Sequence, residues 1–139
     1  MIVMDSSAVV AILRDEPERQ QFIDIIDRSE YCYFSAANTL ETRIVLHNLL
    51  RERSSIALDA FFADTNPKVI DVTRKTSDVA FEAFLRYGKG QGKGAGLNFG
   101  DCFSYALAKE MDLPLLFKGN DFSQTDIRVA TQEYQNDPG

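Results

Sequence analysis

The residues best suited to chemistry in this chain are carboxylates that stand at unusual places in its pattern. Asp5 directly follows a short apolar run, and Asp121 follows a later one. Glu41 falls among the apolar residues of a long helical pattern, and Asp101 lies near the start of another. If these side chains meet, they form an all-oxygen site without a histidine or cysteine ligand. Such donors select hard divalent cations, Mg²⁺ or Mn²⁺, which can activate water against phosphate esters.

Each of these acids also has an ordinary structural explanation. Asp5 can cap the helix that begins at residue 6, and Asp101 has the spacing of a capping box with Asn98. Asp121 is a common type of turn residue, and a buried Glu41 can be paired with an arginine or a backbone N–H. Taken together, however, four clustered carboxylates would repel one another, by about 4 kcal/mol per pair at 4 Å in a dielectric of 20. Such a cluster requires cations.

Strand-like and helix-like segments alternate along the chain, which predicts an α/β fold with a mostly parallel sheet covered by helices. The expected strands are 2–4, 31–34, 69–72, 115–117 and 127–130, and the expected helices are 6–13, 18–29, 36–53, 56–63, 73–87 and 98–111. Asp5 then lies at the carboxyl end of the first strand, the edge at which ligands bind in open α/β sheets. In the long helix, Glu41 is expected on the core-facing stripe with Ala37, Ile44 and Val45.

Length and composition indicate one domain over residues 1–139, with residues 131–139 as a flexible tail. The net charge of −6 argues mildly against extensive coating of nucleic acid, although bound cations would neutralise part of it. Cys32 and Cys102 are expected as reduced core residues, and His47 as structural or exposed. No apolar run is long enough to span a membrane and no signal peptide is recognisable, so we expect a cytoplasmic protein.

Four segments together resemble the PIN-domain ribonucleases, specifically the VapC-type toxins of toxin–antitoxin pairs. They are Met4-Asp5-Ser6-Ser7-Ala8, Thr39-Leu40-Glu41, Gly100-Asp101-Cys102-Phe103-Ser104-Tyr105-Ala106, and Gly119-Asn120-Asp121-Phe122 with Thr125-Asp126-Ile127. The resemblance spans residues 2 to about 129. It implies a PIN-like three-layer sandwich with a sheet of four to five strands.

The resemblance also implies a function, an endoribonuclease that depends on Mg²⁺ or Mn²⁺. By motif, Asp5, Glu41 and Asp101 are the metal-binding and catalytic acids, and Asp121 is the fourth. Asp126 is an alternative metal ligand at that last place. The implied partners are RNA, a cognate antitoxin whose helix enters the acidic groove, and a second copy of the chain. The resulting assembly would be a homodimer, and a heterotetramer or larger with antitoxin.

Other polar residues near these motifs are candidates for supporting roles. Ser6, Ser7, Asn38 and Thr39 can orient the carboxylates or bound waters. Lys89 and Lys93 lie in the glycine-rich segment 88–96, which fits neither a P-loop nor a dinucleotide fingerprint. That segment is either a flexible connector or a loop whose lysines hold RNA phosphates beside the acids.

Two other functions remain open from the sequence alone. In a phosphorylatable receiver domain, Asp5, Asp71 and Lys118 would form the acid pocket with its lysine. That interpretation leaves Glu41 and Asp101 unexplained. A purely structural or binding protein would require that the acid cluster does not assemble.

Overall fold

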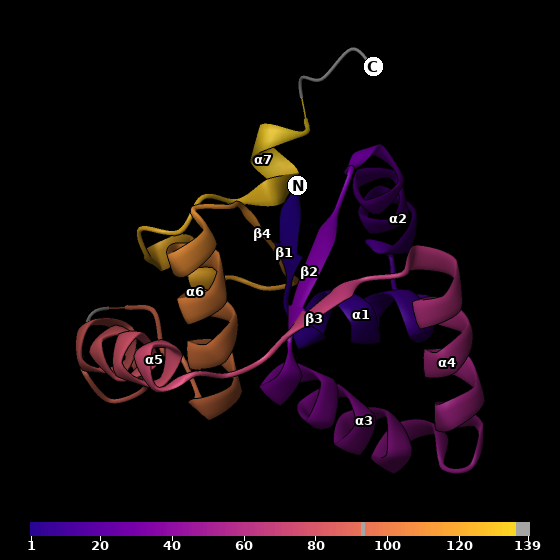
Figure 1. Ribbon diagram of the computed structural model, residues 1–139, viewed down its shortest axis with the longest axis horizontal. Coiled ribbons are helices and arrows are strands. Elements are labelled where there is room, and N and C mark those ends of the chain that lie inside the picture. Colours follow the sequence, from indigo (N-terminus) through magenta and orange to yellow (C-terminus); the bar gives the residue numbers. More distant parts are fainter. Residues whose placement is uncertain (93, 136–139) are drawn as a thin grey trace.

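The computed structural model describes residues 1–92 and 94–135, and it has a four-stranded parallel sheet at its centre (Figure 1). The strands are β1 (Ile2–Met4), β2 (Cys32–Ser35), β3 (Lys68–Ile70) and β4 (Leu115–Leu116), in the order β3-β2-β1-β4. The helices are α1 (Ser6–Leu13), α2 (Arg19–Arg28), α3 (Ala36–Leu50), α4 (Arg53–Thr65), α5 (Arg74–Tyr87), α6 (Phe99–Met111) and α7 (Ala130–Glu133). The predicted α/β class is confirmed.

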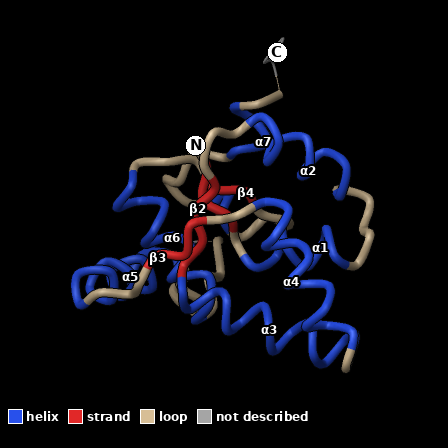
Figure 2. The backbone as a smooth tube through the Cα atoms, turned by 45° about the vertical axis from the view of Figure 1, so that its right-hand side comes forward, coloured by secondary structure: helices blue, strands red, loops and turns tan. Residues whose placement is uncertain are grey.

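Side chains alternate across the strands and so supply two separate cores. Ile2 and Met4 pack with residues of α1, α2 and α4 on one face of the sheet. Val3 and Leu115 pack with residues of α5 and α6 on the other face. Figures 1 and 2 show these two groups of helices on opposite sides of the strands. The molecule is therefore the expected three-layer sandwich.

The sheet order places a topological switch point between β1 and β4. From β1 the chain proceeds outward to β2 and β3, whereas β4 pairs with the other side of β1. Ligands in open α/β sheets bind at such a point, outside the carboxyl ends of the strands. Asp5 follows β1 here, and the segment that contains Asp121 follows β4.

The carboxyl-terminal region differs from the sequence-based expectation. No fifth strand forms within the described residues, because Val129 makes only an isolated bridge to Leu115 and α7 begins at the next residue. Part of the expected tail is also folded: the Tyr134 carbonyl accepts a hydrogen bond from Arg28 (2.8 Å), and its hydroxyl accepts one from Ser29 (3.0 Å). Residues 136–139 lie outside the described part of the chain.

The long helix α3 buries a different face from the one predicted. Its buried residues are Asn38, Thr42 and Leu46, whereas Ile44 is 53% exposed and Glu41 is partly exposed. The prediction that Glu41 faces the core is therefore wrong. Polar residues can occupy the buried stripe because they are hydrogen-bonded; the Thr42 hydroxyl, for example, donates to the Asn38 carbonyl (2.7 Å). No helix in residues 1–92 or 94–135 is long and apolar enough to cross a membrane.

Candidate active site

Asp5 is a buried carboxylate held by two donors at the end of β1. Only 3% of its surface is exposed. Its Oδ2 caps α1 by accepting a hydrogen bond from the Ser7 backbone N–H (2.9 Å). Its Oδ1 lies 2.5 Å from the Ser104 hydroxyl on α6. The capping role expected from the sequence is thus real, and it leaves the carboxylate at the switch point of the sheet.

Glu41 reaches the same region from α3. Its Oε1 accepts hydrogen bonds from the Ser6 hydroxyl (2.5 Å) and from the Asn38 side-chain amide (3.1 Å). Its carboxylate also packs on the backbone of Gly100, where an added Cβ would overlap it. Ser6 and Asn38 therefore both hold the Glu41 carboxylate, while Gly100 makes room for it.

Asn38 and Ser104 join the end of β1, helix α3 and helix α6. The Asn38 amide donates to Glu41 and to the Gly100 carbonyl (3.0 Å), so its Oδ1 must face Ser104 (2.9 Å). A serine hydroxyl has one proton, so Ser104 can donate to Asp5 or to Asn38 but not to both at once. The buried network is therefore one donor short, and a cation at Asp5 would relieve that shortage.

Ser104 and Gly100 are site residues that the sequence reasoning missed. Both flank Asp101 in the motif of the late helix, and Ser104 is three residues further along, on a neighbouring position of the same helical surface. That spacing could have predicted that Ser104 lies on the same side of the helix as Asp101. The need for glycine at position 100 was not readable, because it depends on contact with a different helix.

Asp101 combines a capping role with an unusual ionisation. It forms a capping box with Asn98, in which its Oδ2 accepts from the Asn98 backbone N–H (3.0 Å). Burial raises the pKa of Asp101 to about 7, although the capping hydrogen bond from Asn98 lowers it. The negative charges of Asp5, Asp121 and Glu41 raise it further. Asp101 therefore lies within electrostatic reach of the other three acids.

Asp121 lies in the segment between β4 and α7. An ideal Cβ added to Gly96 would stand 4.0 Å from Asp121 Oδ1, so the end of the glycine-rich segment runs beside this acid. The segment is fixed at its start, where the Lys118 backbone N–H donates to the Ser7 hydroxyl (3.0 Å). Ser7 therefore supports both strand ends, Asp5 through its backbone and the Asp121 segment through its side chain.

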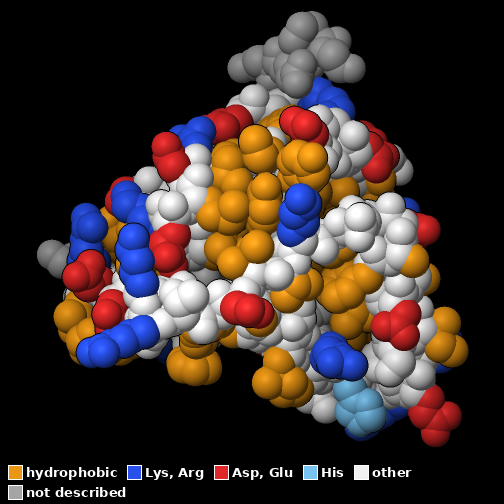
Figure 3. Space-filling view, viewed as in Figure 1, with side chains coloured by type: hydrophobic (Ala, Val, Ile, Leu, Met, Phe, Trp, Pro, Cys, Tyr) orange, Lys and Arg blue, Asp and Glu red, His pale blue; other side chains and the backbone are white. Residues whose placement is uncertain are grey.

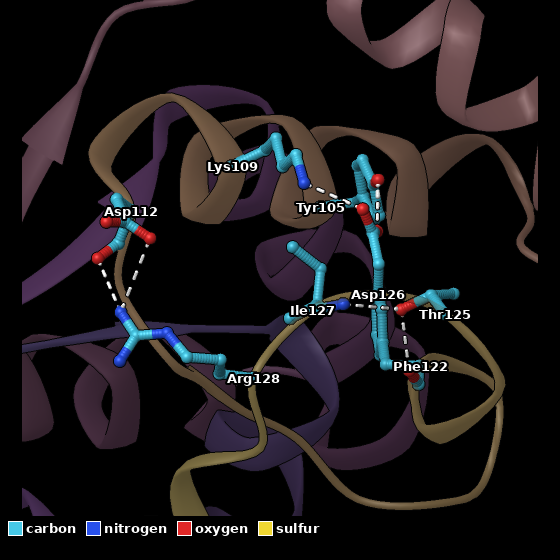
Figure 4. Close-up of polar contacts among 8 residues, drawn as sticks. All are labelled: Tyr105, Lys109, Asp112, Phe122, Thr125, Asp126, Ile127 and Arg128. Carbon is cyan, nitrogen blue, oxygen red and sulfur yellow. Dashed lines mark hydrogen bonds and ion pairs between the residues drawn. The ribbon is translucent and has the colours of Figure 1, made fainter.

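Other candidates make contacts outside this acid group. Asp126 accepts hydrogen bonds from Tyr105 (2.5 Å) and Lys109 (2.7 Å), as Figure 4 shows. The Thr39 hydroxyl donates to the Ala36 carbonyl of its own helix (2.6 Å). Lys89 is exposed, and Lys93 lies outside the described residues.

Burial raises the pKa of the Cys32 thiol to about 11, consistent with a core residue.

The donor set suits a hard cation that retains water. Within the described ranges, no three carboxylate, imidazole or thiolate side chains already stand close enough to hold one ion together. Mg²⁺ does not need such a cage, because it is usually bound through one or two carboxylates and several waters. The raised pKa of Asp101 and the missing donor beside Asp5 both favour added positive charge at this place.

The geometry does not support a receiver-like acid pocket. Asp71 follows β3, which is separated from β1 by β2, so Asp71 and Asp5 do not follow adjacent strands. The Lys118 ammonium pairs with Glu16 (2.9 Å) and Glu18 (3.2 Å), which lie after α1. Asp5, Asp71 and Lys118 therefore lie in different surroundings and do not form one acid pocket.

Comparison with known proteins agrees with this geometry. A family model described as the PIN domain matches residues 2–128. Ribonuclease VapC28 of Mycobacterium tuberculosis is 41% identical over 129 residues, which cover 93% of this chain and 97% of that protein. Ribonuclease VapC of Mycolicibacterium smegmatis is 42% identical over 129 residues, which cover 93% of this chain and 99% of that protein.

Solved structures share the fold at lower identity. Mycobacterium tuberculosis VapC20, described as a sarcin-ricin loop cleaving toxin, aligns with a TM-score of 0.75 at 18% identity, covering 91% of this chain and 96% of that one. VapBC2 from Rickettsia felis, solved with a fragment of promoter DNA, aligns with a TM-score of 0.71 at 16% identity, covering 93% and 96%. The match of the family model and the identity to curated relatives extend over nearly the whole chain. The chain therefore belongs to the PIN-domain family and, within it, to the VapC ribonucleases.

Proposed function

We propose that this chain is an endoribonuclease that requires Mg²⁺ or Mn²⁺ and acts as the toxin of a toxin–antitoxin pair. One observation carries the proposal: in a VapC-type chain, hydrogen bonds through Ser104 and Asn38 link Asp5 to Glu41 at the switch point of the sheet. Burial, together with the charges of Asp5, Asp121 and Glu41, raises the pKa of Asp101 beside them. Bound there, the ion would supply a water of lowered pKa and stabilise charge on the phosphodiester.

The protein's own residues have distinct tasks in this proposal. Asp5, Glu41, Asp101 and Asp121 would hold the ion directly or through water. Ser104 and the Ser7 N–H orient Asp5, while Ser6 and Asn38 orient Glu41. Fixed orientation matters because catalysis falls steeply when a reacting group is misplaced by about 1 Å.

The proposal is tested by RNA cleavage with purified protein. Asp5→Asn keeps an oxygen for Ser7 but removes the charge, so we expect cleavage to fall below detection while the circular dichroism spectrum is retained. Asp71→Asn is the matched control, since Asp71 is an exposed acid after another strand. Metal-dependent cleavage that persists in Asp5→Asn would contradict the assignment, and phosphorylation of Asp71 by a small phosphodonor would favour a receiver.

We propose an antitoxin partner on the basis of the family. The solved relatives include a toxin–antitoxin complex from Klebsiella pneumoniae and VapBC from Salmonella typhimurium bound to DNA. An antitoxin that places a basic side chain among the carboxylates of this chain would neutralise them and exclude the cation. We expect it to be encoded beside this gene and to co-purify with this chain.

A homodimer is proposed on the exposed apolar surface beside the site. Leu40, Ile44, Phe81 and Phe99 are 53–82% exposed on α3, α5 and α6. A groove of about 410 Å³ runs between α3 and α6, past Glu41 and Gly100. Figure 3 shows hydrophobic side chains protruding along the lower margin, on the side where α3 runs and α6 begins in Figure 1. Exposed apolar residues that gather on one surface often mark a protein interface.

A further inference from the structure

Asp126 is the one sequence-predicted acid whose contacts lie away from the other four, and those contacts indicate what it does. Its two oxygens are occupied by separate donors, Oδ1 by the Tyr105 hydroxyl and Oδ2 by the Lys109 ammonium. Burial alone would raise the pKa of Asp126, but hydrogen bonds from Lys109 and Tyr105 outweigh it and hold that pKa below its usual range. Asp126 is thus a fully paired anion.

Both donors belong to the helix that carries Asp101. Asp101, Tyr105 and Lys109 are four residues apart along α6, so they lie on one face of the helix, one turn above another. Tyr105 is rigid, because it is only 3% exposed and its ring lies 5.8 Å from that of Tyr87. The face of α6 that begins with a site acid therefore continues as a binding surface for Asp126.

The segment between Asp121 and Asp126 is too well bonded to flex independently. The Phe122 ring is 2% exposed and lies 5.1 Å from the Phe117 ring. The Thr125 hydroxyl donates to the Phe122 carbonyl (2.7 Å) and accepts from the Ile127 backbone N–H (3.2 Å), as seen in Figure 4. A change in the place of Asp126 would therefore move Asp121 as well.

We propose that Asp126 is a positioning residue, which with Tyr105 and Lys109 fastens the 119–127 segment to α6 and so sets Asp121 opposite Asp101. We call these three residues the Asp126 cluster. In this role Asp126 does not bind the metal. The proposal rests on the function proposed above, since it concerns the place of the fourth acid, but its structural part can be tested without metal.

The first measurement is amide hydrogen exchange in metal-free protein. Three variants are compared: Asp126→Asn, the double variant Tyr105→Phe/Lys109→Met, and the triple variant that combines them. We expect exchange at the Thr125 and Ile127 amides to accelerate in all three, by about tenfold. The Lys118 amide, which is held by Ser7 at the other end, should keep its rate. Asp112→Asn is the matched control, because Asp112 is an exposed acid paired with Arg128 near the end of the same segment.

The second measurement is Mn²⁺ affinity, followed by electron paramagnetic resonance. Loss of a residue that orients a metal ligand typically weakens binding about tenfold or more. We expect Asp126→Asn and the double variant to weaken Mn²⁺ binding equally, and the triple variant to be no worse than either, because all remove one and the same linkage. Saturating Mn²⁺ should restore the cleavage rate of Asp126→Asn but not that of Asp5→Asn.

Two results would overturn the proposal. In one, Asp126→Asn weakens Mn²⁺ binding without faster exchange at Thr125 and Ile127, which would make Asp126 a metal ligand. In the other, the effects of Asp126→Asn and of the double variant add in the triple variant. If wild-type protein binds no Mn²⁺, the proposed metal requirement fails, and the exchange rates still decide whether the Asp126 cluster holds the segment.

Discussion

The carboxylate of Glu41 packs directly on the backbone of Gly100, so α3 and α6 meet at a point with no space for a side chain. The Gly100 carbonyl accepts a hydrogen bond from Asn38, which also holds Glu41. Two helices distant in sequence are thereby locked together one residue before Asp101. The position of Glu41 relative to Asp101 depends on this contact.

Gly100→Ala should damage the site more than the fold. Alanine is favoured over glycine in a helix by up to about 1 kcal/mol, so local helix stability should not fall. The new Cβ would displace the Glu41 carboxylate, and we expect the rate of RNA cleavage to drop by about 100-fold. Cleavage kinetics and thermal unfolding of the same samples separate the two effects. An unchanged cleavage rate would show that the place of Glu41 is not critical.

Ser104→Ala should affect both stability and metal binding. It removes the hydroxyl shared by Asp5 and Asn38, and a buried polar group left without its partner costs about 1–3 kcal/mol. Because Asp5 also loses its orientation, we expect Mn²⁺ affinity to fall by about tenfold or more. Ser54→Ala, at a buried serine of α4, should leave Mn²⁺ affinity unchanged. Equal Mn²⁺ affinity in both variants would remove Ser104 from the site.

The ionisation of Asp101 should be visible in metal-free protein. Its folded pKa of about 7 exceeds the value of about 4 expected in the unfolded chain. The folded state therefore binds this proton more tightly, so the contribution of Asp101 to stability is greatest below pH 4 and is lost as the pH rises through 7. Carboxyl ¹³C NMR in the presence of chelator should give a midpoint near 7.

Two further titrations of Asp101 test the effects of a neighbouring charge and of a cation. Asp121→Asn removes one of the repelling charges and should lower the Asp101 midpoint. Adding Mg²⁺ should lower it as well, since a cation stabilises the ionised form. A midpoint near 4 in metal-free wild-type protein would contradict the pKa increase that burial and the neighbouring acids produce at Asp101.

Phe99 offers a direct test of the proposed homodimer. It is 82% exposed, and its ring packs edge-on against Phe103 (5.0 Å) at the margin of the apolar groove. We expect Phe99→Ser to shift the protein from dimer to monomer in light scattering coupled to size exclusion. Ile56→Ser, at a residue of α4 that is 74% exposed, is the matched control and should leave the mass unchanged. A wild-type monomer would contradict the dimer.

The lysines of the glycine-rich segment should affect RNA affinity through charge alone. Gly96 at the end of that segment lies beside Asp121, which brings the segment to the edge of the proposed site. In the inactive Asp5→Asn background, Lys89→Ala with Lys93→Ala should weaken RNA binding for all sequences and reduce the slope of log K against log salt by about 1.4, since each lost phosphate contact on a single strand accounts for about 0.7. Lys75→Ala, on α5, serves as the control. An unchanged slope would exclude the segment from RNA binding.

Several features of this protein were determined by the sequence because they are local. Alternating strand and helix patterns gave the α/β class, since hydrophobic periodicity follows directly from backbone geometry. Asp5 after β1 and Asp101 in its capping box were placed correctly for the same reason, as both depend on residues within three positions.

Tertiary structure decided the features that depend on contact between distant segments. The face that α3 buries was mispredicted because apolar periodicity does not count polar residues, such as Asn38 and Thr42, whose hydrogen bonds offset the cost of burial. Residues 130–133 form α7 instead of the end of a fifth strand and the start of a tail, and the Tyr134 that follows packs beside α2. The different surroundings of Asp121 and Asp126 likewise could not be predicted from the sequence. Only the folded chain brings Tyr105 and Lys109 to Asp126 and brings Asp121 close enough for its charge to raise the pKa of Asp101.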